Sequence, residues 1–201
     1  IIYLVRSSEK DVEEFNKSLA LLEETLLKYT TADVLVFVEE SFEKYKSKVE
    51  TNLELLYQTI EFNLPDYPSE ILDNIPEFYP HPTHGNGPIE WGHPGFTMGY
   101  RHMCRLFSGE IYKFPVVQEY EYYIRLDTDS FIHTSLGYDI FKWAKDNECL
   151  YGYVAPAVQQ DNKKVVEGVW DFVNSIYPND IPDRWMYYTN WELGKVDWFL
   201  T

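Results

Sequence analysis

The fold is decided by the stretch Glu119-Tyr120-Glu121-Tyr122-Tyr123-Ile124-Arg125-Leu126-Asp127-Thr128-Asp129. Residues 122–126 are aromatic or aliphatic except for Arg125, which predicts a short buried strand. This strand would deliver Asp127 and Asp129 at its C-terminal end, where open α/β sheets bind their ligands. Two carboxylates placed there suit Mg²⁺ or Mn²⁺, which are usually held by few carboxylates together with substrate phosphates. An isolated Asp-X-Asp is also common in ordinary acidic turns, so the motif needs support from its context.

Flanking segments predict a central, mostly parallel sheet. Residues 1–5 are continuously apolar, as in a strand buried on both faces, and residues 33–38 contain a second such run after Asp33. Between them, apolar residues recur every three or four positions from Val12 to Leu26, which predicts a helix packed on the sheet and begun by Ser8 with Asp11. Strand, helix and strand at this spacing form a right-handed parallel crossover. We therefore expect an α/β fold in which residues 122–126 lie centrally and parallel to residues 1–5.

The rest of the chain alternates between helical and strand patterns around one long loop. We expect helices at residues 42–49, 98–107, 139–146 and 165–176, and a strand at residues 150–154. Prolines and glycines gather between residues 65 and 94, which predicts a functional or mobile loop whose three histidines lie at the surface. Arg101 and Arg105 lie four positions apart on one helical face, and they either pair with carboxylates or bind phosphate.

Charge and composition limit the partners. The 33 acidic residues outnumber the 17 basic ones, and the net charge of −16 argues against nucleic acids and anionic membranes. Aromatic residues make up 17% of the chain, which fits sugar-binding clefts and core filling equally well. Cys104 and Cys149 could form a disulfide or remain two thiols. We find no membrane segment and no leader, so we expect a soluble chain trimmed from a longer protein.

Several motifs, taken in order, resemble one enzyme family. They are Leu4-Val5-Arg6, Tyr100-Arg101-His102-Met103-Cys104-Arg105, the stretch 120–129, and Asn190-Trp191-Glu192-Leu193-Gly194. These motifs are similar to those of the fungal α-1,2-mannosyltransferases of glycosyltransferase family 15, which carry Tyr-Arg-His-Met-Cys-Arg-Phe, Tyr-Tyr-Trp-Arg-Val-Glu-Pro-Asp and Asn-Phe-Glu-Ile-Gly. The likeness spans nearly the whole chain and is weakest in residues 65–94 and 155–185.

The resemblance implies a GT-A-like nucleotide-binding sandwich, with a mostly parallel sheet flanked by helices. It also implies GDP-mannose as donor, Mn²⁺ as cofactor, a mannosyl glycan or glycoprotein as acceptor, retention at the anomeric carbon, and a type II membrane protein of the Golgi lumen. We expect one catalytic domain over residues 1–201, without its N-terminal stem and anchor and its C-terminal part.

Site residues follow from the same resemblance. Asp127, with Asp129 near it, would hold the metal, and Glu192 would be the catalytic carboxylate. The donor would be bound by Arg6, Tyr100 and Arg125, with Arg101 and Arg105 as helpers. From the sequence alone Glu192 reads as an acidic residue near a helix start, where such residues stabilise the helix dipole.

Two departures from the family pattern bear on the metal. Asp127-Thr128-Asp129 replaces Glu-Pro-Asp, so the first carboxylate is one methylene shorter. The family also has a metal-binding His beyond the equivalent of Thr201, so we expect either an incomplete chain or a differently built metal site.

Two other functions compete with the mannosyltransferase hypothesis. An inactive glycan- or nucleotide-sugar-binding relative would keep the site without turnover. A phosphohydrolase of the haloacid dehalogenase type would also use a strand ending in Asp-X-Asp, but its motif belongs to the first strand and is followed by Thr or Val where this chain has Phe131.

Overall fold

The computed structural model describes residues 1–63, 68–72, 78–79, 96–153, 159–160, 169–176, 185–186 and 190–200. These residues fall into two compact units. The first, here called the sheet unit, comprises Ile1–Asn63, Gly109–Val154 and Thr189–Thr201, and the second unit comprises Leu64–Ser108 and Ala155–Tyr188. The expected single catalytic domain over residues 1–201 stays a prediction.

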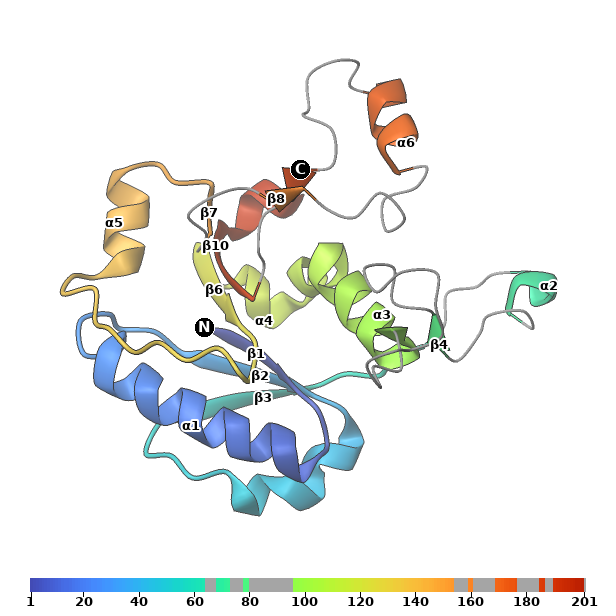
Figure 1. Cartoon of the computed structure of the whole chain (residues 1–201). Helices are drawn as coiled ribbons and strands as arrows, with labels where there is room; N and C mark the ends of the chain where they lie inside the picture. The colour runs from blue at the N-terminus through green and yellow to red at the C-terminus, as the bar shows by residue number, and fades with distance from the viewer. Residues whose placement is uncertain are drawn as a thin grey trace. The chain divides into compact units, whose positions relative to one another are not determined.

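A six-stranded sheet forms the centre of the sheet unit, with the strand order β3-β2-β1-β6-β10-β7 (Figure 1). The first four run parallel, whereas β10 is antiparallel to both β6 and β7. β6 thus lies inside the sheet and parallel to β1, which confirms the expected central, mostly parallel sheet. The bounds in sheet order are β3 Leu55–Thr59, β2 Val34–Val38, β1 Ile2–Val5, β6 Tyr122–Leu126, β10 Trp191–Lys195 and β7 Tyr151–Tyr153.

One face of the sheet is covered by α1, Glu9–Thr25, which lies across β1, β2 and β3 in Figure 1. Every second side chain of each strand points toward this helix, and the buried apolar residues of the helix pack on these side chains. Tyr3 of β1 and Ile124 of β6 are two of them. The Ser8 hydroxyl accepts a hydrogen bond from the Asp11 amide, so Ser8 caps the helix as the sequence predicts. A second helix, α5 at Ile140–Asp146, adds to this face and is capped by Asp139.

The opposite face is covered by short helical segments, η4 at Ile111–Lys113, α4 at Pro115–Gln118 and η5 at Val196–Leu200. Tyr112 of η4 stacks on Phe199 of η5 with ring centroids 4.3 Å apart, and both rings contact Tyr123 of β6. Because successive strand residues point to opposite faces, Tyr123 and Arg125 share this side of β6. The candidate site is built on this face.

Some elements differ from expectation in type or extent. The segment expected as a helix around Phe42 is a 3₁₀ helix, η1 at Glu40–Lys48, and β3 and β10 were not expected as strands. Strand β7 begins at Tyr151, one residue later than expected. Both cysteines are free thiols, Cys104 exposed and Cys149 half-buried, so the open alternative of a disulfide is not realised.

The described part of the second unit consists of short elements. They are α2 Ser69–Leu72, β4 Phe78–Tyr79, β5 Phe96–Thr97, α3 Met98–Arg105, β8 Gln159–Gln160, α6 Val169–Ile176 and β9 Trp185–Met186. β4 pairs with β5, and β8 pairs with β9, in two small antiparallel ladders. A π-helical turn, Leu106–Glu110, follows α3 where the sequence predicts that the helix continues. The three histidines expected at the surface lie outside the described residues. In the described part of the chain, no helix is long and apolar enough to cross a membrane.

Candidate active site

Two neighbouring parallel strands deliver charged residues to the same edge of the sheet. β1 ends at Val5 and is followed by Arg6, while β6 ends at Leu126 and is followed by Asp127. Since β1 and β6 pair in parallel, their carboxyl ends meet at one edge, the usual place for a ligand in an open α/β sheet.

Arg125 and Asp127 form an ion pair at this edge. Arg125 Nη2 donates to Asp127 Oδ1 at 3.0 Å. The Arg125 side chain is only 7% exposed, so its charge depends on acidic partners, while the Asp127 side chain is 33% exposed and can still meet a ligand. A buried guanidinium is costly unless it is paired, and Asp127 supplies such a partner, while the expected contact of Arg125 with the donor stays a prediction.

The loop that carries the two aspartates is tied to the segment before β10. Both the Asp127 amide and the Ser130 hydroxyl donate to the Asn190 carbonyl, at 3.3 and 2.7 Å. The Ser130 amide donates to the Asp127 carbonyl at 2.9 Å, which closes the turn. These bonds fix the backbone at Asp127, while Asp129 remains exposed.

A divalent cation fits the chemistry of this loop. Asp127 and Asp129 offer carboxylate oxygens, the hard ligands that Mg²⁺ and Mn²⁺ prefer. Both side chains reach solvent from a turn that is closed by a backbone hydrogen bond. Within the described residues no group of three or more His, Cys, Asp or Glu gathers that could hold a metal. An ion at Asp127 would thus take part of its coordination from ligand phosphates or from residues outside the described ranges.

Glu192 is the second residue of β10 and lies directly opposite Arg125 of β6. The prediction that Glu192 sits near a helix start is wrong, because pairing with two strands extends this segment and η5 begins only at Val196. A role in stabilising a helix dipole is thereby removed. The Glu192 residue is 4% exposed, and its carboxylate accepts hydrogen bonds from the hydroxyls of Tyr123 at 3.2 Å and Tyr151 at 2.9 Å.

Burial controls the electrostatics of Glu192. Removal from water raises the pKa of its carboxyl above the usual value, while the Arg125 charge and the two tyrosine hydroxyls act against the rise. Burial likewise raises the pKa of Tyr112 to about 12 and raises the pKa values of Tyr123 and Tyr151, so all three hydroxyls keep their protons at neutral pH. Neither tyrosine was expected from the sequence to contact Glu192. The only available signal was the alternation that puts Tyr123 and Arg125 on one face of a strand.

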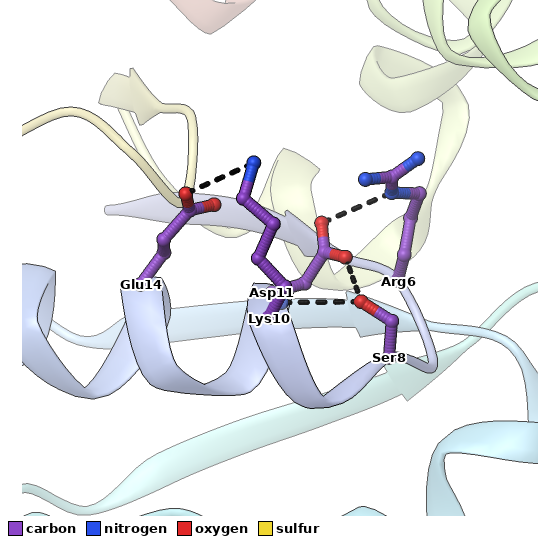
Figure 2. A network of polar contacts seen from close by, with 5 residues as sticks. All are labelled: Arg6, Ser8, Lys10, Asp11 and Glu14. Atoms are coloured by element: carbon purple, nitrogen blue, oxygen red, sulfur yellow. Dashed lines mark hydrogen bonds and ion pairs between the residues drawn. The ribbon is translucent and has the colours of Figure 1, made fainter.

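Arg6 extends from the end of β1 beside the start of α1, as Figure 2 shows. Its Nε donates to Asp11 Oδ1 at 3.0 Å, and Asp11 is held in turn by the capping residue Ser8. The Arg6 side chain is 75% exposed and Asp11 is buried, so the carboxylate anchors one edge of the guanidinium. The Lys10–Glu14 pair drawn beside it is an exposed helix-surface contact.

The other residues predicted to bind the donor belong to the second unit. Tyr100, Arg101 and Arg105 all lie on α3, with Tyr100 exposed, and the two arginines are one helical turn apart as expected. Their part in donor binding stays a prediction, as do the assigned roles of Arg6, Arg125, Asp127, Asp129 and Glu192.

Comparison with known proteins places the chain in a family. The model of the glycolipid 2-alpha-mannosyltransferase family matches residues 1–199. The chain is 33% identical over 122 residues to Probable mannosyltransferase KTR3 of Saccharomyces cerevisiae, a match covering 52% of this chain and 30% of that protein. It is 26% identical over 221 residues to O-glycoside alpha-1,2-mannosyltransferase omh1 of Schizosaccharomyces pombe, covering 98% of this chain and 55% of that one.

Solved structures show the same fold. The mannosyltransferase Ktr4p of S. cerevisiae aligns with a TM-score of 0.73 at 22% identity, covering all of this chain and 56% of that one. Core-mannan synthase A of Aspergillus fumigatus, solved in an Mn/GDP form, aligns with a TM-score of 0.71 at 18% identity, over all of this chain and 60% of that one. The matches thus cover between 30% and 60% of the length of these proteins. The expected GT-A-like fold is confirmed. The family match over nearly every residue shows that the chain belongs to the glycolipid 2-alpha-mannosyltransferase family.

Proposed function

We propose that this chain is the catalytic part of a retaining, metal-dependent α-1,2-mannosyltransferase that transfers mannose from GDP-mannose to a mannosyl glycan acceptor. One observation carries the proposal: Arg125 pairs with Asp127 at the edge of β6 and faces Glu192 across the β6–β10 ladder. A guanidinium suited to an anion, a carboxylate suited to a metal ion and a second, buried carboxylate therefore lie within one small region of a chain from this family.

The residues at the sheet edge would bind the diphosphate of the donor. Asp127, with Asp129 nearby, would hold Mn²⁺, which when bound would neutralise the departing diphosphate. Arg6 is exposed beside the same edge with its guanidinium anchored by Asp11, so its remaining donors can take phosphate oxygens. Tyr100, Arg101 and Arg105 are further donor-binding candidates on α3.

Glu192 would supply negative charge near the anomeric carbon. A retaining transfer needs a carboxylate on the face opposite the leaving diphosphate, either as a nucleophile or to stabilise an oxocarbenium-like ion pair. The carboxylate of Glu192 is suited to either role because it is buried and its charge is stabilised by fixed hydrogen-bond donors, so water does not have to reorient around it. By its family resemblance we place the whole protein in the Golgi lumen as a type II membrane protein.

The test is release of GDP from GDP-mannose with a mannoside acceptor, measured with and without Mn²⁺. We expect Mn²⁺-dependent release accompanied by a product that an α-1,2-specific mannosidase cleaves. Glu192→Gln keeps the shape of the side chain and removes its charge, so it should lower kcat at least about 100-fold while GDP affinity stays unchanged. The matched control is Glu121→Gln, an exposed residue that pairs with Lys145 on the sheet unit.

Other outcomes would assign a different function. Binding of GDP-mannose with Mn²⁺ but no release with any mannoside would indicate a non-catalytic relative. Turnover by Glu192→Gln at the parent rate would remove Glu192 from the catalytic role. Membership in the mannosyltransferase family argues against the phosphohydrolase, which would be revealed by an acid-labile phosphate on Asp127.

A further inference from the structure

The Glu192 carboxylate is bound at both of its oxygen atoms by tyrosine hydroxyls from the two neighbouring strands. Tyr123 of β6 reaches Oε1 at 3.2 Å, and Tyr151 of β7 reaches Oε2 at 2.9 Å. A third tyrosine, Tyr112 of η4, lies 2.7 Å from the Tyr123 hydroxyl. The chain of hydroxyls thus runs from η4 through β6 to the carboxylate.

The charge on Glu192 fixes the direction of these hydrogen bonds. An ionised carboxylate can only accept, so Tyr123 must give its single proton to Glu192. The Tyr123 oxygen then accepts from Tyr112, because Tyr123 has no second proton to give. With Tyr151 donating to the other oxygen, every hydroxyl in the group is oriented toward the negative charge.

The register of the sheet explains why the two tyrosines converge. Gly194 pairs with Tyr123 on one side and with Tyr151 on the other, so the three residues form one row across the strands. Glu192 lies two positions from Gly194 and shares its face of β10. Since Gly194 has no side chain, the space above it is left to the tyrosine rings. A Cβ at this position would lie 2.8 Å from the Phe199 ring and closer still to the Tyr123 ring.

The rings have little freedom to move. Tyr123 is 2% exposed and contacts Tyr112 and Phe199 at centroid distances of 5.4 and 5.9 Å. Phe199 also contacts Tyr151 edge-on at 6.2 Å. A hydroxyl on a locked ring presents its donor at a fixed point, which is the requirement for preorganised charge stabilisation.

We propose that Tyr123 and Tyr151 are positioning residues that hold Glu192 as an oriented carboxylate, and that Tyr112 orients the Tyr123 hydroxyl. This inference rests on the proposed catalytic role of Glu192. The other charged groups that act on Glu192 are Arg125 and Asp127, both from β6 and the loop after it. The hydroxyls of Tyr123 and Tyr151 donate directly to the two carboxylate oxygens, so the tyrosines orient the carboxylate in a way that charge alone does not.

The experiment replaces each hydroxyl and leaves each ring in place. Tyr123→Phe and Tyr151→Phe remove one bond to Glu192, and Tyr112→Phe removes the donor to Tyr123. Tyr122→Phe is the matched control, since Tyr122 precedes Tyr123 on β6 but points to the opposite face and bonds the Ala144 carbonyl. Two quantities are measured in the full chain: the midpoint of the Glu192 titration by NMR with ¹³C-carboxyl-labelled glutamate, and the pH profile of kcat and KM for GDP-mannose. The Glu192 signal is identified by its loss in Glu192→Gln.

We expect the midpoint of Glu192 to rise by about one pH unit in Tyr123→Phe and in Tyr151→Phe, because a hydrogen bond that favours the charged form is lost. The acidic limb of the kcat profile should move upward with it, and kcat at neutral pH should fall by roughly 10-fold, with KM for the donor unchanged. Tyr112→Phe should give a smaller change of the same sign, and Tyr122→Phe none. Because Tyr151 is only half-buried, we expect Tyr151→Phe to fold normally, so it still tests the inference if Tyr123→Phe folds poorly.

Unchanged midpoints in both Tyr123→Phe and Tyr151→Phe would overturn the inference, as would an effect confined to KM or to thermal stability. The two proposals fail separately. If the parent chain transfers no mannose, the proposed function fails, while the NMR midpoints still decide whether the tyrosines hold the charge of Glu192. If the parent is active and the midpoints do not move, the function stands and the positioning role is rejected.

Discussion

At the scale of single residues, the site depends on carboxylates in contrasting surroundings. Asp127 is partly exposed, paired with Arg125 and fixed by its backbone, whereas Glu192 is buried among tyrosine hydroxyls. An exposed carboxylate can exchange water for a metal ion at little cost, while a buried one keeps a fixed orientation. The division of labour proposed for the two residues follows from these surroundings.

Asp127→Asn should abolish Mn²⁺-dependent binding of GDP. The amide keeps an oxygen that can accept from Arg125, but it lacks the charge that a divalent ion requires, so metal affinity should fall by about 100-fold or more. Titration calorimetry with Mn²⁺ and GDP gives the measurement. Asp127→Ala should lose binding equally and also lose stability, because Arg125 would remain buried without this partner.

Asp146→Asn is the control for this prediction, since Asp146 is an exposed residue paired with Lys142 at the end of α5. It should bind Mn²⁺ and GDP as the parent does. Unchanged affinity in Asp127→Asn would place the metal elsewhere.

At the scale of elements, β10 has an unusual composition for a strand, and its unusual residues build the candidate site. It carries Glu192 and Gly194 in its interior, although glutamate and glycine are both depleted in strands. Tertiary contacts override that preference: the carboxylate finds donors on both neighbouring strands, and the glycine admits the Tyr123 ring.

Gly194→Ala should therefore destabilise the fold and impair the site together. The added methyl group would displace the rings of Tyr123 and Phe199, and overpacking of this kind typically costs about 1–3 kcal/mol. We expect a lower midpoint of unfolding in denaturant and a reduced kcat.

Gly152→Ala on the adjacent strand is the matched control. A Cβ there would meet its nearest neighbour, the Leu193 side chain, at 3.6 Å, an ordinary van der Waals distance. This variant should unfold within about 0.5 kcal/mol of the parent. Equal stability of the two variants would show that the crowding at Gly194 is relieved by small shifts.

The contrast between these strands also shows how far the sequence predicts the fold. β1, β2 and β6 were predictable because a strand buried on both faces is almost wholly apolar, and α1 because its apolar stripe and Ser8 cap are local signals. β3 is half-exposed at the sheet edge, and β10 carries Glu192 and Gly194 on either side of Leu193, so neither has a clear local strand pattern.

The candidate site was predictable to a similar extent. Asp127 and Arg125 are two positions apart, so their juxtaposition could be inferred from one strand. The bonds from Tyr123 and Tyr151 to Glu192 span 69 and 41 positions, and only the order and register of the strands bring those residues together. Without a known register, the surroundings of Glu192 could not be derived.

At the scale of the whole molecule, the sheet unit draws its site from all three of its chain segments. Arg6 comes from the first, Arg125 and Asp127 from the second, and Glu192 from the third. The site can therefore form only when the entire sheet is assembled. The chain also carries a net charge of −16, so folding brings many acidic side chains close enough to repel one another.

Added salt should consequently stabilise the fold. Raising NaCl to about 0.5 M screens repulsion between charges that are more than a few ångströms apart, while the buried core is little affected. We expect the thermal midpoint to rise by a few °C between low salt and this concentration, measured by circular dichroism at pH 7. A fall in the midpoint would show that attractive surface pairs such as Lys145–Glu121 outweigh the net repulsion.

The buried carboxylate of β10 makes the fold less stable than it could be. A folded-state pKa raised above the unfolded one means that the native state binds the proton more tightly, so ionised Glu192 opposes folding above that pKa, and the penalty fades as the pH falls through it. Glu192→Gln, a neutral mimic, should therefore raise the thermal midpoint at pH 8, and its advantage should shrink toward pH 5. The charge proposed to act in turnover would therefore lower the stability of the sheet that holds it, as is common at functional sites.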